Sequence, residues 1–209
     1  INKSHLKTVQ KIINNVRKNK EKALIHYEKK FNNNLKIIPS KNEIKKAIKS
    51  LDPKVKKAID DAHKRIKEWH SKQKIRDIYY KDKLNNKFYY RTVPISDVAL
   101  YVPANLPSSL LMCATPAIIC KVKRIVVLTP SINGKLNPAI YYAASKLKLN
   151  EVYAVSGASA IAAAAYGTST IKPVSKIKGI VKSDLILSAV PCSSLKLVIT
   201  SCSCFPFGM

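Results

Sequence analysis

Four histidines offer the only imidazole nitrogens in this sequence for metal binding or proton transfer, and all four precede residue 71. His63 and His70 are seven residues apart, so on a helix they share one face but lie two turns apart, about 10 Å along the axis. A zinc ion holds each nitrogen at about 2 Å, so this pair does not make one zinc site. We expect the histidines to be solvated or to cap helices. They are His5, His26, His63 and His70.

The five cysteines match neither a disulfide framework nor a zinc module. Their number is odd and their spacing is irregular, which in a chain of 209 residues favours a reducing cytoplasm. Cys202 and Cys204 form a C-x-C pair and Cys192 precedes them, but a zinc site would need a fourth ligand and a different spacing. We therefore predict no metal ligand in this chain and a cytoplasmic location.

Two adjacent carboxylates, Asp60 and Asp61, are the remaining candidates for acid/base chemistry. On a helix, adjacent side chains point about 100° apart, which places such a pair poorly for joint catalysis. We interpret both as counter-charges to neighbouring lysines. The residue types that usually do chemistry thus give no catalytic constellation on their own, and the elements around them are more informative.

The chain is strongly basic, with 38 Lys+Arg against 12 Asp+Glu and a net charge of +26. Only five of the 38 are arginine, the residue that grips phosphate and guanine with a bidentate fork. Lys, Asn and Ile share A/T-rich codons, so codon drift accounts for their abundance and we do not expect nucleic acid as a partner. A lysine-rich nucleic-acid-binding protein remains the alternative from another class. Glycine occurs five times where average usage would give about fifteen, which indicates that glycine-rich binding loops are worn or absent.

Three helices are predicted before residue 74 from apolar residues at helical spacing. The first covers residues 4–31. The second begins at Ser40, which has capping-box spacing to Glu43, and the third begins at Asp52 with Pro53 in its first turn. The apolar stripe of the third helix consists of Val55, Ala58, Ile59, Ala62, Ile66 and Trp69.

After these helices the pattern changes to strands. Aromatic residues cluster at 78–80 and 87–93 around a polar turn, which predicts a hairpin. Strands then alternate with helices, which predicts a parallel sheet with right-handed crossovers. No apolar run reaches the roughly 18 residues that span a bilayer, so no membrane is expected. The strands are expected at 98–102, 124–129 and 151–155, and the helices at 108–120, 137–147 and 157–166.

Five segments of this α/β region, in this order and spacing, resemble the histidinol dehydrogenase family. The resemblance extends over about Val9 to Gly179 and corresponds to roughly the first half of a full-length enzyme. It implies oxidation of L-histidinol to L-histidine with two NAD molecules, the last step of histidine biosynthesis, by a homodimer with one zinc per site. The segments are A-L-Y-V-P, P-S-S-L-L-M-C-A-T-P-A, V-K-R-I-V-V-L-T-P, N-P-A-I-Y-Y-A-A and S-G-A-S-A-I-A-A-A-A-Y-G-T.

Three positions carry over to the cofactor NAD. Tyr101 stands where the family has a tyrosine that contacts NAD, although from chemistry alone a packed strand-end aromatic is the favoured interpretation. Ser159 replaces a family glutamine that contacts NAD, so the contact is lost or bridged by water. Gly157 is kept where the backbone turns into a helix. The loop 104–106 is shorter than the family's, and 180–182 replaces a family turn whose asparagine meets NAD.

The zinc ligands and the catalytic glutamate–histidine pair of the family belong to later segments, so the resemblance assigns no catalytic or metal residue here. We expect this chain alone to be inactive, with an inactive gene remnant as a further alternative. The turn 189–193 resembles a later family turn in which Cys192 would replace a substrate-contacting serine.

The expected fold class is α/β, with a helical N-terminal arm and an incomplete Rossmann-like parallel sheet domain. The expected division is a helical arm and hairpin over 1–92, an NAD-binding domain over 93–182, and a degenerate or unassigned tail over 183–209.

Overall fold

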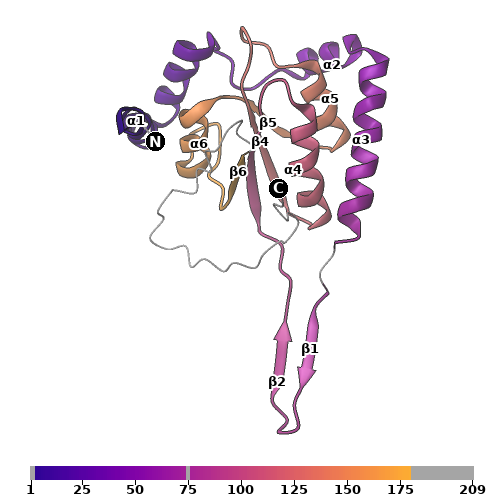
Figure 1. The fold of residues 1–209 in the computed structure, drawn as a ribbon. Helices are drawn as coiled ribbons and strands as arrows, with labels where there is room; N and C mark the ends of the chain where they lie inside the picture. The colour runs from indigo at the N-terminus through magenta and orange to yellow at the C-terminus, as the bar shows by residue number, and fades with distance from the viewer. Residues whose placement is uncertain (1–2, 74–75, 180–209) are drawn as a thin grey trace.

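The computed structural model describes residues 3–73 and 76–179, and its centre is a four-stranded parallel sheet (Figure 1). The strand order is β5-β4-β3-β6. The structure confirms the predicted α/β fold class. The three-residue β6 was not predicted, because so short a segment shows no periodicity. The strands are β3 (Asp97–Tyr101), β4 (Arg124–Thr129), β5 (Glu151–Ala154) and β6 (Ile177–Gly179).

Helices cover both faces of this sheet because successive side chains of a strand point to opposite faces. Val98 and Leu100 of β3 enter the core with α4 (Pro107–Ile119) and α5 (Pro138–Lys146). Ala99 enters the core on the other face with α6 (Gly157–Tyr166) and α1 (Lys3–Asn32). The strands are therefore buried between two helical layers, as their nearly continuous apolar sequences require.

The first helix extends as predicted but is kinked at Lys20, whose φ of 50° and ψ of −124° are not helical. The kink lets α1 follow the surface of α6. The Lys20 ammonium donates to the Tyr166 carbonyl at 2.8 Å, and the Arg17 guanidinium lies 5.3 Å from the centre of the Tyr166 ring. Val16 and Leu24, on either side of the kink, are both fully buried.

The predicted helix starts at Ser40 and Asp52 are confirmed. Ser40 caps α2 (Lys41–Ser50) in a reciprocal capping box with Glu43. The carboxylate of Asp52 accepts from the Lys54 amide at 2.7 Å and caps α3 (Pro53–Ser71). These helices form an outer layer, with α2 against α5 and α3 against α4.

The end of α3 differs from the expectation. Trp69 does not continue the apolar stripe but is 62% exposed, whereas His70, four residues after Ile66, is buried. His70 is thus not solvated, and its Nδ1 lies 2.7 Å from Oε1 of Gln73. Residues three and four positions after Ile66 can both continue the apolar face of a helix, and here packing buries the residue four positions on.

The predicted hairpin is confirmed as β1 (Ile78–Lys81) paired with β2 (Lys87–Tyr90), and it stands away from the sheet and helices (Figure 1). Both strands are exposed along their whole length. The expectation that the second strand reaches residue 93 is wrong. Beyond Tyr90 the Thr92 amide bonds to the Asp77 side chain at 2.9 Å rather than to a partner backbone.

The expected tail over 183–209, with Cys192, Cys202 and Cys204, lies outside the described residues. In the described part of the chain, no helix combines the length and apolar character needed to cross a membrane.

Candidate functional site

The carboxyl ends of the four parallel strands lie along one edge of the sheet, and the strand order reverses between β3 and β6. The chain runs from β3 outward to β4 and β5, then returns to the other side of β3 as β6. In open parallel sheets this reversal separates the flanking loops and leaves a crevice where ligands bind. Tyr101 is the last residue of β3 and pairs with Gly179 of β6, so it lies at the reversal itself.

Tyr101 contacts the start of α6. Its hydroxyl accepts a hydrogen bond from the Gly157 amide at 3.2 Å. The first amides of a helix have no partner within the helix, so the tyrosine satisfies one of them. Gly157 has φ of 60°, and a Cβ at this position would have no atom within 4 Å. The glycine is therefore required by backbone conformation and faces open space, where a ligand can approach the backbone.

Ser159 is turned away from this open space. Its side chain is 3% exposed, and its hydroxyl donates to the Ser156 carbonyl at 2.8 Å. Ser156 precedes α6 but makes no side-chain cap to it. The structure thus brings Tyr101 and Gly157 together and places Ser159 inside the same turn.

A buried carboxylate that the sequence reasoning missed supports this turn. Glu28 of α1 has no exposed surface, and it accepts from the Ser156 amide at 2.7 Å and from the Asn32 side-chain amide at 2.7 Å. Burial raises the pKa of Glu28, and the hydrogen bonds from Ser156 and Asn32 favour the charged form and partly offset that rise. The available signal was a charged residue four positions after Leu24 on the buried face of α1.

A loop after α1 covers the adjacent end of β5. The buried side-chain amide of Asn34 donates to the Ala154 carbonyl at 2.8 Å. The Ala154 amide donates to the Ile37 carbonyl at 2.8 Å. Both backbone groups of Ala154 on the open side of β5 are therefore satisfied, and this loop is fixed beside the turn that starts α6.

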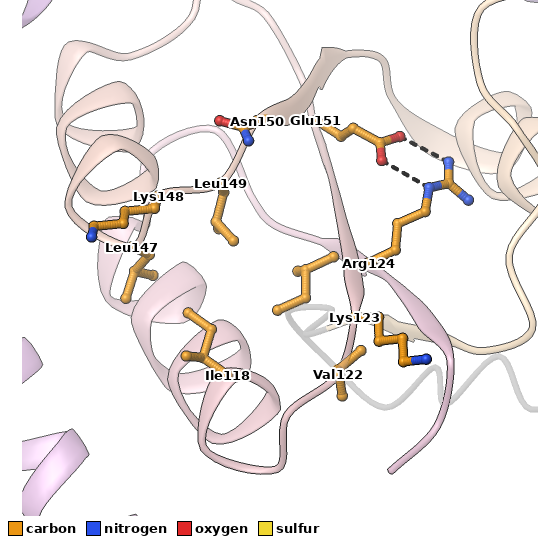
Figure 2. Close-up of a pocket in the computed structure, with 10 residues that line it drawn as sticks. Ile118, Val122, Lys123, Arg124, Leu147, Lys148, Leu149, Asn150 and Glu151 are labelled. Atoms are coloured by element: carbon orange, nitrogen blue, oxygen red, sulfur yellow. Dashed lines mark hydrogen bonds and ion pairs between the residues drawn. The ribbon is translucent and has the colours of Figure 1, made fainter.

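A pocket of about 230 Å³ lies at the opposite end of the sheet, between the amino ends of β4 and β5 (Figure 2). Arg124 and Glu151 form a two-point ion pair beside it, with both N–O distances at 2.8 Å. Arg124 also donates to the carbonyls of Lys172 and Pro173, both at 3.1 Å. These bonds occupy the Arg124 guanidinium, so Arg124 connects three segments of chain and is not available to a ligand. We therefore place the candidate site at the carboxyl ends of the strands.

Comparisons with known proteins agree with this architecture. The profile of the histidinol dehydrogenase family matches residues 2–181. A histidinol dehydrogenase of Pelagibacter ubique is 55% identical over 183 residues, covering 85% of this chain and 43% of the relative. The chain belongs to the histidinol dehydrogenase family.

Further members of the histidinol dehydrogenase family match the same portion. The protein of Mesorhizobium japonicum is 42% identical over 178 residues, covering 82% of this chain and 41% of the relative. The crystal structure of histidinol dehydrogenase from Elizabethkingia anophelis superposes with a TM-score of 0.79 at 31% identity, covering 82% of this chain and 41% of that one. The chain thus spans about two-fifths of the length of these relatives.

The described residues, 3–73 and 76–179, contain no cluster of metal-ligating side chains. Nowhere in these ranges do three or more His, Cys, Asp or Glu side chains gather closely enough to hold a metal ion. Asp60 is a counter-charge, as expected, because its carboxylate lies 2.9 Å from the Lys146 ammonium and accepts from the Tyr142 hydroxyl at 3.1 Å. The described residues therefore do not form a site that fits zinc.

Proposed function

We propose that this chain forms the NAD-binding part of a histidinol dehydrogenase. The whole enzyme would oxidise L-histidinol to L-histidine with two NAD, as a cytoplasmic homodimer with one zinc per site. Family membership and the names of the relatives support this proposal. We assign the nucleotide to residues 93–182 and the zinc-dependent chemistry to the part of the family's length that this chain does not span.

The observation that carries the proposal is the contact between Tyr101 and Gly157 at the strand reversal. Bound NAD would accept hydride. The amino end of α6 would face the pyrophosphate, since the helix dipole favours negative charge there. Gly157 would let the phosphate approach the backbone, because it has no side chain to obstruct it.

The other two positions have different roles in this proposal. The Tyr101 hydroxyl, already held by one amide, keeps its own proton free to donate to a nucleotide oxygen. The Ser159 hydroxyl is buried and engaged with Ser156, so we propose that it shapes the wall of the site and reaches NAD only through water.

Calorimetric titration of the purified chain with NAD tests the proposal. We expect Tyr101→Phe to weaken binding about five- to tenfold, the effect of one hydrogen bond of about 1 kcal/mol. Tyr79→Phe, on the exposed hairpin, is the matched control and should bind as wild type does. Absence of NAD binding by the wild-type chain, or equal binding by Tyr101→Phe, contradicts the proposal.

A second measurement addresses the division of labour. With histidinol, NAD and added zinc, we expect no NADH formation by this chain alone, because its described residues include no metal cage. Sustained turnover by the purified chain would show that the zinc-dependent chemistry does not need the remaining length of the family.

A further inference from the structure

We propose that Glu28 is a positioning residue for the nucleotide site, holding the start of α6 so that the Gly157 amide meets the Tyr101 hydroxyl. Glu28 lies on α1, far from the site in sequence and outside the segments that carry the family resemblance to NAD binding. The inference rests on the proposed function for its consequence in NAD binding, whereas the positioning itself depends only on the geometry.

Two consecutive amides at the start of α6 are held by two side chains from distant parts of the chain. The Ser156 amide donates to the Glu28 carboxylate at 2.7 Å. The next amide, of Gly157, donates to the Tyr101 hydroxyl at 3.2 Å. A peptide plane between two fixed amides has little freedom to rotate, so displacement of the first changes the direction of the second.

The second oxygen of the carboxylate completes the arrangement. It accepts from the Asn32 side-chain amide at 2.7 Å, and the same amide nitrogen lies 2.5 Å from the Ser156 hydroxyl. Serine is among the best residues for capping a helix, yet Ser156 makes no side-chain cap to α6. Its hydroxyl is engaged by Asn32 instead, so the start of α6 depends on the contacts from Glu28 and Tyr101.

Packing alone does not require a carboxylate at this position. Glu28 is fully buried beside the start of α6, in a place that an apolar side chain could fill without desolvating a charge. The amino end of α6 and the two donors compensate that desolvation. The specific contribution of Glu28 is therefore the direction it gives to the Ser156 and Gly157 amides.

Glycine-selective ¹⁵N labelling of the whole chain provides a direct readout, because the chain has only five glycines. Loss of one signal in Gly157→Ala identifies the Gly157 amide. The chemical shift of this signal in Tyr101→Phe gives its position when the hydrogen bond to the Tyr101 hydroxyl is absent. Glu28→Gln keeps the size of the side chain but has one acceptor oxygen instead of two, so it cannot accept from both the Ser156 amide and the Asn32 side chain. We expect the Gly157 signal of this variant to move toward that position.

Glu21→Gln is the matched control. Glu21 lies on the same helix and accepts from the Thr170 amide at 3.0 Å and the Thr170 hydroxyl at 2.8 Å, so it holds a different loop. We expect this variant to leave the Gly157 signal in place. An unmoved Gly157 signal in Glu28→Gln, or an equal shift in Glu21→Gln, overturns the positioning role. Should Glu28→Gln fail to fold, Asn32→Ala is measured in the same way and should shift the signal part of the distance.

Titration with NAD then tests the consequence for the site. We expect Glu28→Gln to weaken NAD binding about three- to tenfold and Glu21→Gln to leave it unchanged. If the wild-type chain does not bind NAD, the proposed function fails, and the Gly157 signal still decides the positioning role. If NAD binds equally to wild type and Glu28→Gln although the signal has moved, the link between positioning and binding is overturned.

Discussion

The ion pair between Arg124 and Glu151 allows a quantitative test of how the sheet is held together. The two side chains are 24% and 33% exposed and share two bonds of 2.8 Å. Exposed pairs contribute about 0.2–1 kcal/mol, and breaking fully buried pairs costs about 3–5 kcal/mol. An intermediate, two-point pair should therefore show a coupling free energy of about 1–2 kcal/mol.

A double-mutant cycle with Arg124→Met and Glu151→Gln measures this coupling by urea unfolding at pH 7, followed by circular dichroism. The single variants should not be equal. Arg124→Met should cost about 2–3 kcal/mol, because it also removes donors to the carbonyls of Lys172 and Pro173. Glu151→Gln should cost about 1–2 kcal/mol. A coupling free energy below about 0.3 kcal/mol, or a larger cost for Glu151→Gln than for Arg124→Met, refutes this account of the ion pair.

The pH dependence of the same pair has a definite sign. Hydrogen bonds from Arg124 lower the pKa of Glu151 from its ordinary value of 4.5. A carboxyl whose pKa is lowered in the folded state contributes stability above pH 4.5, and this is lost as pH falls through the folded-state pKa. The difference in unfolding free energy between wild type and Glu151→Gln should accordingly shrink below about pH 4. A constant difference down to about pH 2 would show that the charge of Glu151 is not what Arg124 recognises.

Three further predictions concern other parts of the fold. Lys20→Gly should be about 1 kcal/mol more stable than Lys20→Ala, because both variants lose the hydrogen bond to Tyr166 and only glycine adopts the positive φ of the kink without strain; equal stability of the two variants in urea unfolding would show that the kink is not strained. Thr129→Val should stabilise by about 1 kcal/mol in the same assay, since the buried Thr129 hydroxyl has no hydrogen-bond partner in the described part of the chain; destabilisation would reveal a partner. Hydrogen bonds from Lys36 and then Ser40 lower the pKa of Glu43 to about 2. The contribution of the charged Glu43 to the unfolding free energy is therefore present above pH 4.5 and is lost as pH falls through 2. An NMR titration of Glu43 with a midpoint near 4.5 would contradict the capping box.

Local signals in the sequence specified most of the elements. The helix starts at Ser40 and Asp52 were predictable because capping uses side chains within three residues of one another. The kink at Lys20 was not, because it follows from the wrapping of α1 around α6 rather than from any residue nearby. β6 was missed because three residues pair with β3 only after the chain has crossed the sheet.

The candidate site shows the same division between local and distant determinants. The sequence pattern gave Tyr101 only as a strand-end aromatic, and its assignment to NAD came from the family resemblance. Its contact with Gly157 joins residues 56 positions apart, and the contact of Glu28 with Ser156 joins residues 128 positions apart. No periodicity reports such pairs, so a buried acid on an apolar helix face was the only available sign.

The loop that occupies Ala154 has a consequence for how this sheet can grow. An exposed strand edge is a template for pairing, and the side chain of Asn34 and the carbonyl of Ile37 already saturate the far end of β5. At this end of the sheet, a further strand can therefore pair only at the opposite edge, next to β6. Any strand that joins there, from the same polypeptide or from another, arrives one neighbour away from Tyr101. A strand added there would enlarge the sheet and close one side of the crevice at the same time.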